Sequence, residues 1–295
     1  MDRHTLKENR IHGRPAYPMS VYEVDLPGHQ PSVDCHWHDE WEWMLVTDGR
    51  GLFQIGSHTY EACAGQTLFI RSGELHAVYR IGDEPCRFTA IVFDAELLVG
   101  ARFDVVQERY LEPLIKKRLE PPPLLAGDEP WERETRSLLE QVLRLNEARR
   151  DGYELDTKAL LLMAAGRLSL HAAAPPATGR HDGDHAKTER LKSALNAIHE
   201  HYATKLSLRR LASEAGMSEG HFCRFFKSMV RKSPTEYING YRVRMAARLL
   251  ENEDRNVSEV ALDVGFENPS YFIRVFKQYQ GCTPAAYKKM LAGRD

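Results

Sequence analysis

The feature that most constrains this 295-residue chain is an internal repeat in its last third. The stretch LASEAGMSEGHFCRFFK, which begins at Leu211, is echoed by VALDVGFENPSYFIRVFK, which begins at Val260. The alignment places Gly216 opposite Gly265, and an arginine and a final lysine also match. A match of this length indicates that one supersecondary unit occurs twice.

Each copy has the pattern of two short helices joined by a tight turn. A small residue, Ala212 or Ala261, lets the helices cross closely, and the glycine four residues later accepts the positive φ of the turn. This is the pattern of a helix-turn-helix. In the second helix, aromatic residues at helical spacing predict one buried face and one exposed face. Arg224 and Arg274 occupy the same exposed position and suit a guanine edge.

Between the copies, PTEYINGYRVRMAARLL (residues 234–250) predicts one continuous helix with Pro234 in its first turn. The residues predicted to form an apolar stripe on this helix are Tyr237, Tyr241, Ala246, Leu249 and Leu250. Its length is about 25 Å at roughly 1.5 Å per residue. Together with the widths of the helices, this length suits two recognition helices at about the 34 Å spacing of successive major-groove faces. The exposed residues of the copies differ, so we expect a non-palindromic DNA site.

Charge divides the chain into two parts. Residues 187–295 carry 19 Lys and Arg against 12 Asp and Glu, whereas the residues before them carry 21 against 30. A basic part that follows an acidic one favours nucleic acid as the partner of the basic part. We therefore predict a first domain at 1–172, a linker rich in Pro, Gly and His at 173–187, and a helical domain at 188–295.

The first part predicts antiparallel β structure followed by helices. Over residues 17–95, short apolar runs are broken by predicted Gly-bearing turns, such as WEWMLVT before DGRG and LFQI before GSH. This pattern is typical of a barrel or sandwich. Two amphipathic helices follow within residues 105–172. Their apolar residues would either pack on the barrel or form a dimer interface, and we favour the dimer. These residues are Leu138, Leu139, Val142, Leu145, Leu160, Leu161, Ala164 and Leu168.

The stretch HWHDEWEW (residues 36–43) combines imidazoles and a carboxylate at strand spacing. On one continuous strand these polar groups would share a face, and Trp41 and Trp43 would lie on the other. His76 follows a Gly-bearing turn and would close the group. Three imidazoles and one carboxylate suit a divalent ion such as Fe, Mn, Ni or Zn. The residues predicted on the shared face are His36, His38, Glu42, Met44 and Val46.

Residues 188–292 resemble the DNA-binding domain of the AraC/XylS transcriptional regulators. The resemblance rests on VALDVGFENPSYFIRVFK, on TPAAYKK, and on Arg242, Ala246, Leu249 and Leu250. It implies a sequence-specific bacterial regulator, more often an activator that contacts RNA polymerase, with an effector-sensing and dimerisation domain in front. The candidate DNA contacts are Ser218, Glu219, Gly220, His221, Cys223, Arg224, Lys227, Asn268, Ser270, Tyr271, Ile273, Arg274 and Lys277.

Residues 20–95 resemble the two cupin motifs, which implies a small β-barrel with a pocket in its mouth. The first motif is matched by His36, His38, Glu42 and Gly49, and the second by Gly65, Gly73 and His76, with Arg71 where proline is usual. The pocket has three interpretations: a catalytic metal centre, a metal that senses or holds an effector, and a metal-free polar pocket, which we favour. The candidate effector-binding residues are His36, His38, Glu42, Met44, Arg71 and His76, and the candidate metal ligands are His36, His38, Glu42 and His76.

Our overall prediction is an α+β chain of two domains. The first is a cupin-like antiparallel barrel with helices, and the second is an all-α domain with two helix-turn-helix units joined by a linking helix. We expect a homodimeric, effector-controlled transcription factor that binds double-stranded DNA and responds to a sugar or small metabolite. The alternative is a metal-dependent cupin enzyme with a basic accessory domain. No apolar run reaches the roughly 18–20 residues that span a bilayer, so we expect no membrane partner. The five scattered cysteines, without CxxC spacing, indicate reduced thiols in a cytoplasmic protein.

Overall fold

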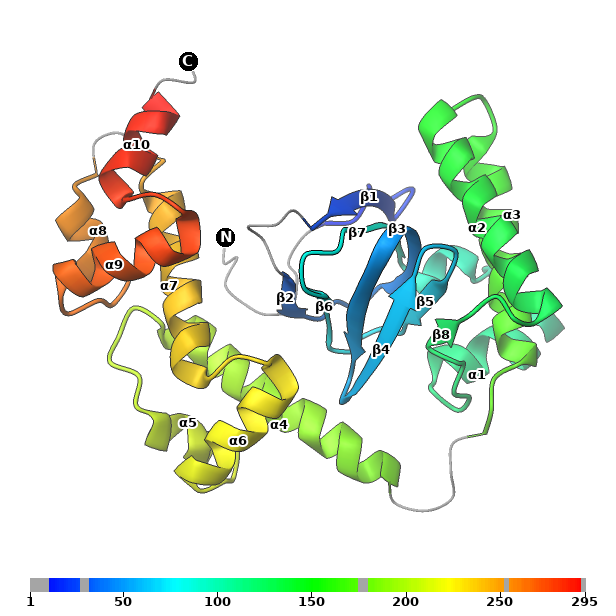
Figure 1. The fold of residues 1–295 in the computed structure, drawn as a ribbon. Helices are drawn as coiled ribbons and strands as arrows, with labels where there is room; N and C mark the ends of the chain where they lie inside the picture. The colour runs from blue at the N-terminus through cyan, green and yellow to red at the C-terminus, as the bar shows by residue number, and fades with distance from the viewer. Residues whose placement is uncertain (1–10, 27–31, 175–179, 252–254, 293–295) are drawn as a thin grey trace. The chain divides into compact units, whose positions relative to one another are not determined.

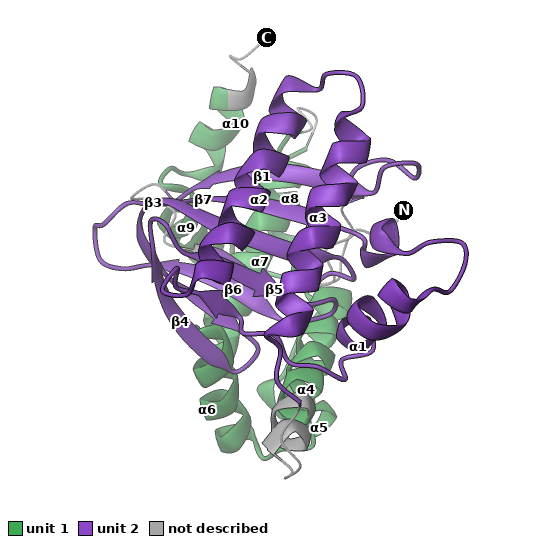
Figure 2. Cartoon of the chain, turned by 90° about the vertical axis from the view of Figure 1, so that its right-hand side faces the viewer, with its two compact units in different colours: residues 1–6, 186–295 green, residues 7–185 purple. Residues whose placement is uncertain are grey.

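The computed structural model describes residues 11–26, 32–174, 180–251 and 255–292 (Figure 1). The chain divides into a β unit, residues 7–185, and a second compact unit that contains residues 186–295, which we call the helical unit (Figure 2). None of the helices within the described ranges is both long and apolar enough to cross a membrane. The two-part α+β organisation that the sequence predicted is therefore confirmed.

The β unit contains two antiparallel sheets that share the long strand β3. The first half of β3 pairs with β7 and β5, and its second half pairs with β4 and β6. One sheet has the order β1-β7-β3-β5-β8, and β2 joins the other sheet through β6. The strands are β1 (Met19–Asp25), β2 (Ser32–His36), β3 (Trp41–Ile55), β4 (His58–Cys63), β5 (Thr67–Ile70), β6 (His76–Arg80), β7 (Cys86–Phe93) and β8 (Leu124–Leu125).

The turn predicted at DGRG (residues 48–51) is wrong, because β3 runs straight through it. The register against β7 shifts between Val46 and Asp48, as in a β-bulge. Gly49 has a φ of +66°, and a Cβ at this position would lie 1.8 Å from the carbonyl oxygen of Pro85. Glycine is therefore required here for a bend that carries β3 from one sheet to the other, and the chain does not reverse.

Helices cover the outer face of the first sheet. The helices α2 (Pro130–Ala148) and α3 (Tyr153–Leu170) lie side by side across its strands (Figure 2). Trp41 and Trp43 pack there, as predicted, in one apolar cluster with residues of both helices. Three shorter helices precede α2: η1 (Ala95–Leu98), η2 (Gln107–Leu111) and α1 (Glu112–Ile115).

Of the two roles considered for the apolar helix residues, packing on the barrel is correct for most of them. Six are buried in the cluster beneath the sheet: Leu138, Leu139, Val142, Leu161, Ala164 and Leu168. Leu160 packs against the same cluster, and Leu145 is half-buried. An interface between two copies would therefore have to use other side chains.

Helix α4 (Arg180–His201) belongs to the helical unit from residue 186 onward. The other helices of this unit are α5 (Leu208–Glu214), α6 (Glu219–Val230), α7 (Pro234–Leu249), α8 (Val257–Asp263), α9 (Pro269–Gln280) and α10 (Pro284–Ala292). Helix α4 begins before Lys187, so residues 180–187 of the expected linker are helical. No proline follows Pro176 until Pro234, and nothing in this segment prevents a helix. The remaining linker residues at 175–179 lie outside the described ranges.

Both repeat copies form the predicted helix-turn-helix, as α5–α6 and α8–α9. The turn glycines Gly216 and Gly265 have φ values of +66° and +88°. The predicted inward faces of α6 and α9 are buried. Those side chains are Phe222, Phe225 and Phe226 in the first copy, and Phe272, Val275 and Phe276 in the second.

The linking helix α7 is buried over a wider surface than the predicted stripe. A capping box between Ser233 and Glu236 begins the helix. Beyond the predicted Tyr237, Tyr241 and Ala246, its buried residues include Ile238, Gly240, Val243, Met245 and Ala247. Both repeat copies contact α7, so side chains all round the helix enter a core. On the α4 side, the buried His199 bonds the Tyr237 hydroxyl at 3.0 Å and stacks on Tyr241.

Arg242 of α7 ties the second repeat copy to the end of α4. Its guanidinium donates hydrogen bonds to the carbonyls of Tyr202 (2.8 Å) and Thr204 (2.9 Å) and lies 5.6 Å from the ring centroid of Phe266. Burial lowers the pKa of Arg242 from its ordinary value, and the two carbonyls compensate for the lost water. Gly265 lies in this junction, since a Cβ there would be 2.6 Å from the Tyr202 oxygen.

The two turn glycines provide a matched test of this junction. We expect Gly265→Ala to destabilise the helical unit by about 2–4 kcal/mol, because the new methyl group adds a clash with backbone to the strain of positive φ. Gly216→Ala meets open space, so only the φ strain of about 1–2 kcal/mol applies. Urea unfolding followed by circular dichroism measures both. Equal losses for the two variants would contradict the packing described for Gly265.

Candidate functional site

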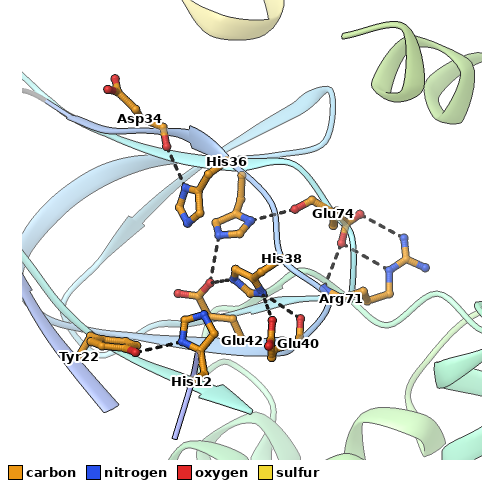
Figure 3. A network of polar contacts seen from close by, with 10 residues as sticks. His12, Tyr22, Asp34, His36, His38, Glu40, Glu42, Arg71 and Glu74 are labelled. Carbon is orange, nitrogen blue, oxygen red and sulfur yellow. Dashed lines mark hydrogen bonds and ion pairs between the residues drawn. The ribbon is translucent and has the colours of Figure 1, made fainter. Parts of the chain in front are cut away.

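A cluster of histidines and one glutamate lies at one end of the barrel (Figure 3). His36 at the end of β2 pairs across the ladder with His76 at the start of β6. His38 follows β2, and a bend at residues 39–40 separates it from Glu42 in β3. The single continuous strand predicted for this stretch is therefore wrong, although the same side chains converge. His38 and His76 are 1% exposed, and Glu42 is 4% exposed.

The glutamate lies between two imidazoles. Oε2 of Glu42 is 3.0 Å from Nε2 of His38 and 3.0 Å from Nε2 of His76. The His36 ring centroid lies 4.2 Å from that of His76. The potential ligand nitrogens of the three histidines all lie within 4.8 Å of one another. The structure thus brings together all four residues that the sequence suggested as metal ligands.

Backbone carbonyls fix the tautomer of each ring. Nδ1 of His36 lies 2.9 Å from the Asp34 carbonyl oxygen, and Nδ1 of His38 lies 3.1 Å from that of Glu40. Nδ1 of His76 lies 2.9 Å from the Glu74 carbonyl oxygen. A carbonyl oxygen only accepts hydrogen bonds, so each Nδ1 carries the proton. The Nε2 atoms of His38 and His76 are the ring atoms that face Glu42, and a backbone contact at Nδ1 is the arrangement of histidines that bind a metal through Nε2.

The charges in the cluster follow from burial. Burial lowers the pKa of His36 to about 3, so this ring is neutral at physiological pH. Burial alone would raise the pKa of Glu42, but its contacts with His76 and His38 hold that pKa below its ordinary value, and the carboxylate stays ionised. Such a carboxylate is held against two Nε2 atoms by a proton or a cation that lies between them. The donor set therefore fits a divalent cation.

Two residues of the site, His12 and Tyr22, carry no signal in the sequence. His12 is 4% exposed, its Nδ1 lies 3.0 Å from the Tyr22 hydroxyl, and its ring centroid lies 5.6 Å from that of His38. The turn at Gly13, with a φ of +77°, packs against the backbone of Tyr17. His12 is far from the HWH stretch in sequence, so no motif spacing includes it. Only tertiary contact places it beside the cluster.

The other two candidate effector residues make different contacts. Met44 is buried in the apolar interior of the barrel, with Phe53 and Phe88 in the same cluster. Arg71 forms an ion pair with Glu74 at 3.2 Å, on the loop that leads into His76 (Figure 3). The Arg71 guanidinium is therefore neutralised within the protein before any ligand binds.

The candidate DNA contacts lie on the exposed faces of α6 and α9. Ser218 and Asn268 are the N-caps of these helices. Cys223 is half-buried, and the other candidates are exposed. Among the described residues, neither Arg224 nor Arg274 has a carboxylate within ion-pair distance. The exposed candidates are Ser218, Glu219, Gly220, His221, Arg224, Lys227, Asn268, Ser270, Tyr271, Ile273, Arg274 and Lys277.

Comparisons with known proteins assign both units. Residues 18–165 match the AraC-like ligand binding domain, and residues 211–290 match a helix-turn-helix domain family. The chain is 31% identical over 289 residues to the uncharacterized HTH-type transcriptional regulator YdeC of Bacillus subtilis, covering 97% of this chain and 96% of YdeC. It is 27% identical over 256 residues to the virulence regulon transcriptional activator VirF of Yersinia enterocolitica, covering 84% of this chain and 89% of VirF.

Among solved structures, the DNA-binding domain of AdpA in complex with a target DNA is 33% identical, with a TM-score of 0.34. That likeness covers 36% of this chain and 95% of the AdpA chain. The full-length likeness to YdeC and the match of the ligand-binding family to half of the chain are sufficient for assignment. The chain belongs to the AraC family of helix-turn-helix transcriptional regulators.

Proposed function

We propose that this regulator reads two unequal DNA segments with α6 and α9, and that a small molecule bound in the β unit controls it. The observation that carries the proposal is the pair of arginines, Arg224 and Arg274, at matched exposed positions of the two copies. A guanidinium donates a bidentate pair of hydrogen bonds to guanine O6 and N7. Lys227 and Lys277, at the end of the same faces, suit phosphate.

The arginine assignment predicts the effect of two substitutions. We expect Arg224→Ala and Arg274→Ala each to weaken binding to a selected promoter duplex by about 1–3 kcal/mol and to relax base preference at one position. Wild-type affinity falls steeply with salt, since phosphate contacts release counterions. Arg144→Ala, on the exposed side of α2, is the control. Fluorescence anisotropy measures all four proteins, and specific binding that survived both arginine substitutions would contradict the assignment.

For the β unit we propose that the histidine cluster is the polar anchor of the effector site. Its buried carboxylate and the closeness of three imidazole rings support a bound divalent cation, held by His36, His38, His76 and Glu42. Such a cation would supply a Lewis-acidic contact for a hydroxyl or carboxylate of the effector, such as a sugar or small metabolite. YdeC and VirF are named as transcriptional regulators, which supports sensing rather than catalysis as the role of the cluster.

Metal binding is tested on the full chain after dialysis against a chelator. Mn²⁺, Fe²⁺, Ni²⁺ or Zn²⁺ that binds only the folded state stabilises it by about 2.7 kcal/mol at one hundred times its Kd. We expect this rise in melting temperature to vanish in His38→Ala and His76→Ala. The exposed His58 of β4 is the control, since His58→Ala keeps the cluster. No metal by elemental analysis and no thermal shift with any of these ions would refute the cation.

We propose further that the protein activates transcription, in contact with RNA polymerase, and acts as a homodimer. The description of VirF as an activator supports the first point. An apolar stripe on the outer side of α3 supports the dimer: Leu155 is 73%, Met163 48% and Leu170 69% exposed. Ala159 is exposed in the same stripe. Small and apolar residues on one exposed helix face allow a second helix to approach closely.

A charge in this stripe should separate the two subunits of the dimer. We expect Met163→Glu to shift the protein towards monomer, because pairing the helices would bury an uncompensated carboxylate. Leu262→Glu is the matched control, since Leu262 is also apolar and 60% exposed but lies in α8 of the helical unit. Sedimentation velocity over a range of concentrations gives the oligomeric state. A wild-type protein that is monomeric at every concentration would contradict the dimer.

A further inference from the structure

Side-chain contacts hold the second recognition helix against the linking helix. The amide Nδ2 of Asn239 on α7 donates a hydrogen bond of 2.8 Å to the hydroxyl of Tyr271 on α9. The Tyr279 hydroxyl at the other end of α9 donates to the Glu236 carbonyl at 2.9 Å. The Tyr279 ring covers Gly240, where a Cβ would lie 2.9 Å from its Cε1. These contacts tie both ends of α9 to the first two turns of α7.

Tyr271, which accepts the hydrogen bond from Asn239, also contacts Arg274. The guanidinium carbon of Arg274 lies 5.2 Å from the ring centroid of Tyr271, three residues earlier on the same helix. Cation–π stacking of this kind uses the face of the guanidinium, so its N–H groups remain available in the plane. Tyr271 and Arg274 are both exposed, so a base edge can reach the stacked group.

The first repeat copy lacks this arrangement. His221 stands at the position of Tyr271, and no stacking of Arg224 on a ring is found among the described residues. The Arg224 guanidinium lies instead over Gly220, where a Cβ would be 3.9 Å from Nη1. Arg224 and Arg274 therefore occupy matched positions but differ in how firmly their side chains are held.

We propose that Asn239 and Tyr271 are positioning residues that aim Arg274 at its base pair. The proposal rests on the DNA reading proposed above for α6 and α9. A free arginine side chain loses rotamer freedom when it binds a base, whereas one that is already stacked loses less. The Tyr271 ring, held by Asn239, thus acts as a platform that favours one orientation of the Arg274 guanidinium. The second copy discriminates between base pairs more sharply than the first.

The test uses the full chain and a duplex enriched by the wild-type protein from a random-sequence library. Every base pair of that duplex is then changed singly, and binding is measured for each change. Arg274→Ala identifies the base pair that Arg274 reads. We expect Tyr271→Ala to reduce discrimination at that same base pair by about two- to fivefold. Asn239→Ala and Tyr271→Phe keep the ring but lose the hydrogen bond, and we expect smaller losses at the same position.

A double variant and a matched control make the readout specific. Asn239→Ala combined with Tyr271→Phe should lose no more discrimination than either alone, because both remove one hydrogen bond. His221→Ala, the equivalent change in the first copy, should leave discrimination at the Arg274 base pair unchanged. If Tyr271→Ala lowers the melting temperature, the Asn239→Ala and Tyr271→Phe variants carry the test.

The outcomes separate this inference from the proposed function. One outcome is that Arg274→Ala abolishes discrimination at one base pair while the Asn239 and Tyr271 variants discriminate there as the wild type does. In that case the positioning role of Asn239 and Tyr271 is refuted, and DNA reading by Arg274 stands. If those variants weaken binding equally for every duplex, their role is structural and the platform is again refuted. If Arg274→Ala reduces discrimination at no base pair, the reading role of Arg274 is refuted, and with it the positioning role of Asn239 and Tyr271.

Discussion

The burial of α7 between two helix-turn-helix copies is the constraint on which the helical unit depends. A pair of helices as short as α5–α6 or α8–α9 cannot bury its apolar face alone, so each copy needs a further surface. Helix α7 supplies that surface to both copies, which explains why its buried residues extend beyond a single stripe. The relative placement of α6 and α9 is therefore set by one shared helix, and a change in its packing would act on the exposed faces of both.

The β unit solves a different problem, which is the burial of polar side chains. Three imidazoles and one carboxylate lie together, and their ring Nδ1 atoms are satisfied by backbone carbonyls of the same segments. This pattern leaves the Nε2 atoms directed at Glu42, where the electrostatics require a positive species. The bulge between Val46 and Asp48 and the bend at Gly49 support the site indirectly, because they let one strand contribute Glu42 to one sheet and pair with β6, which carries His76, in the other.

The two repeat copies share a fold but differ in chemistry. Their inward faces keep aromatic and apolar residues at equivalent positions, because each must fill the same kind of core. Their outward faces are free of that requirement, so Gly220 and His221 stand where Ser270 and Tyr271 occur in the second copy. The two copies thus share one scaffold but present different exposed faces.

Local patterns were sufficient to predict the repeat, the buried and exposed faces of α6 and α9, and the convergence of the histidines with Glu42. Such patterns report which face of an element is apolar. The spacing within one motif also predicts which of its residues lie close together. They do not report what lies opposite that face. Hence only the tertiary structure decided that β3 continues through DGRG, that His12 and Tyr22 join the histidine cluster, and that Asn239 holds Tyr271 beneath Arg274. Each of these depends on contacts between segments far apart in the chain or in separate elements, which the period of a single helix or strand does not encode.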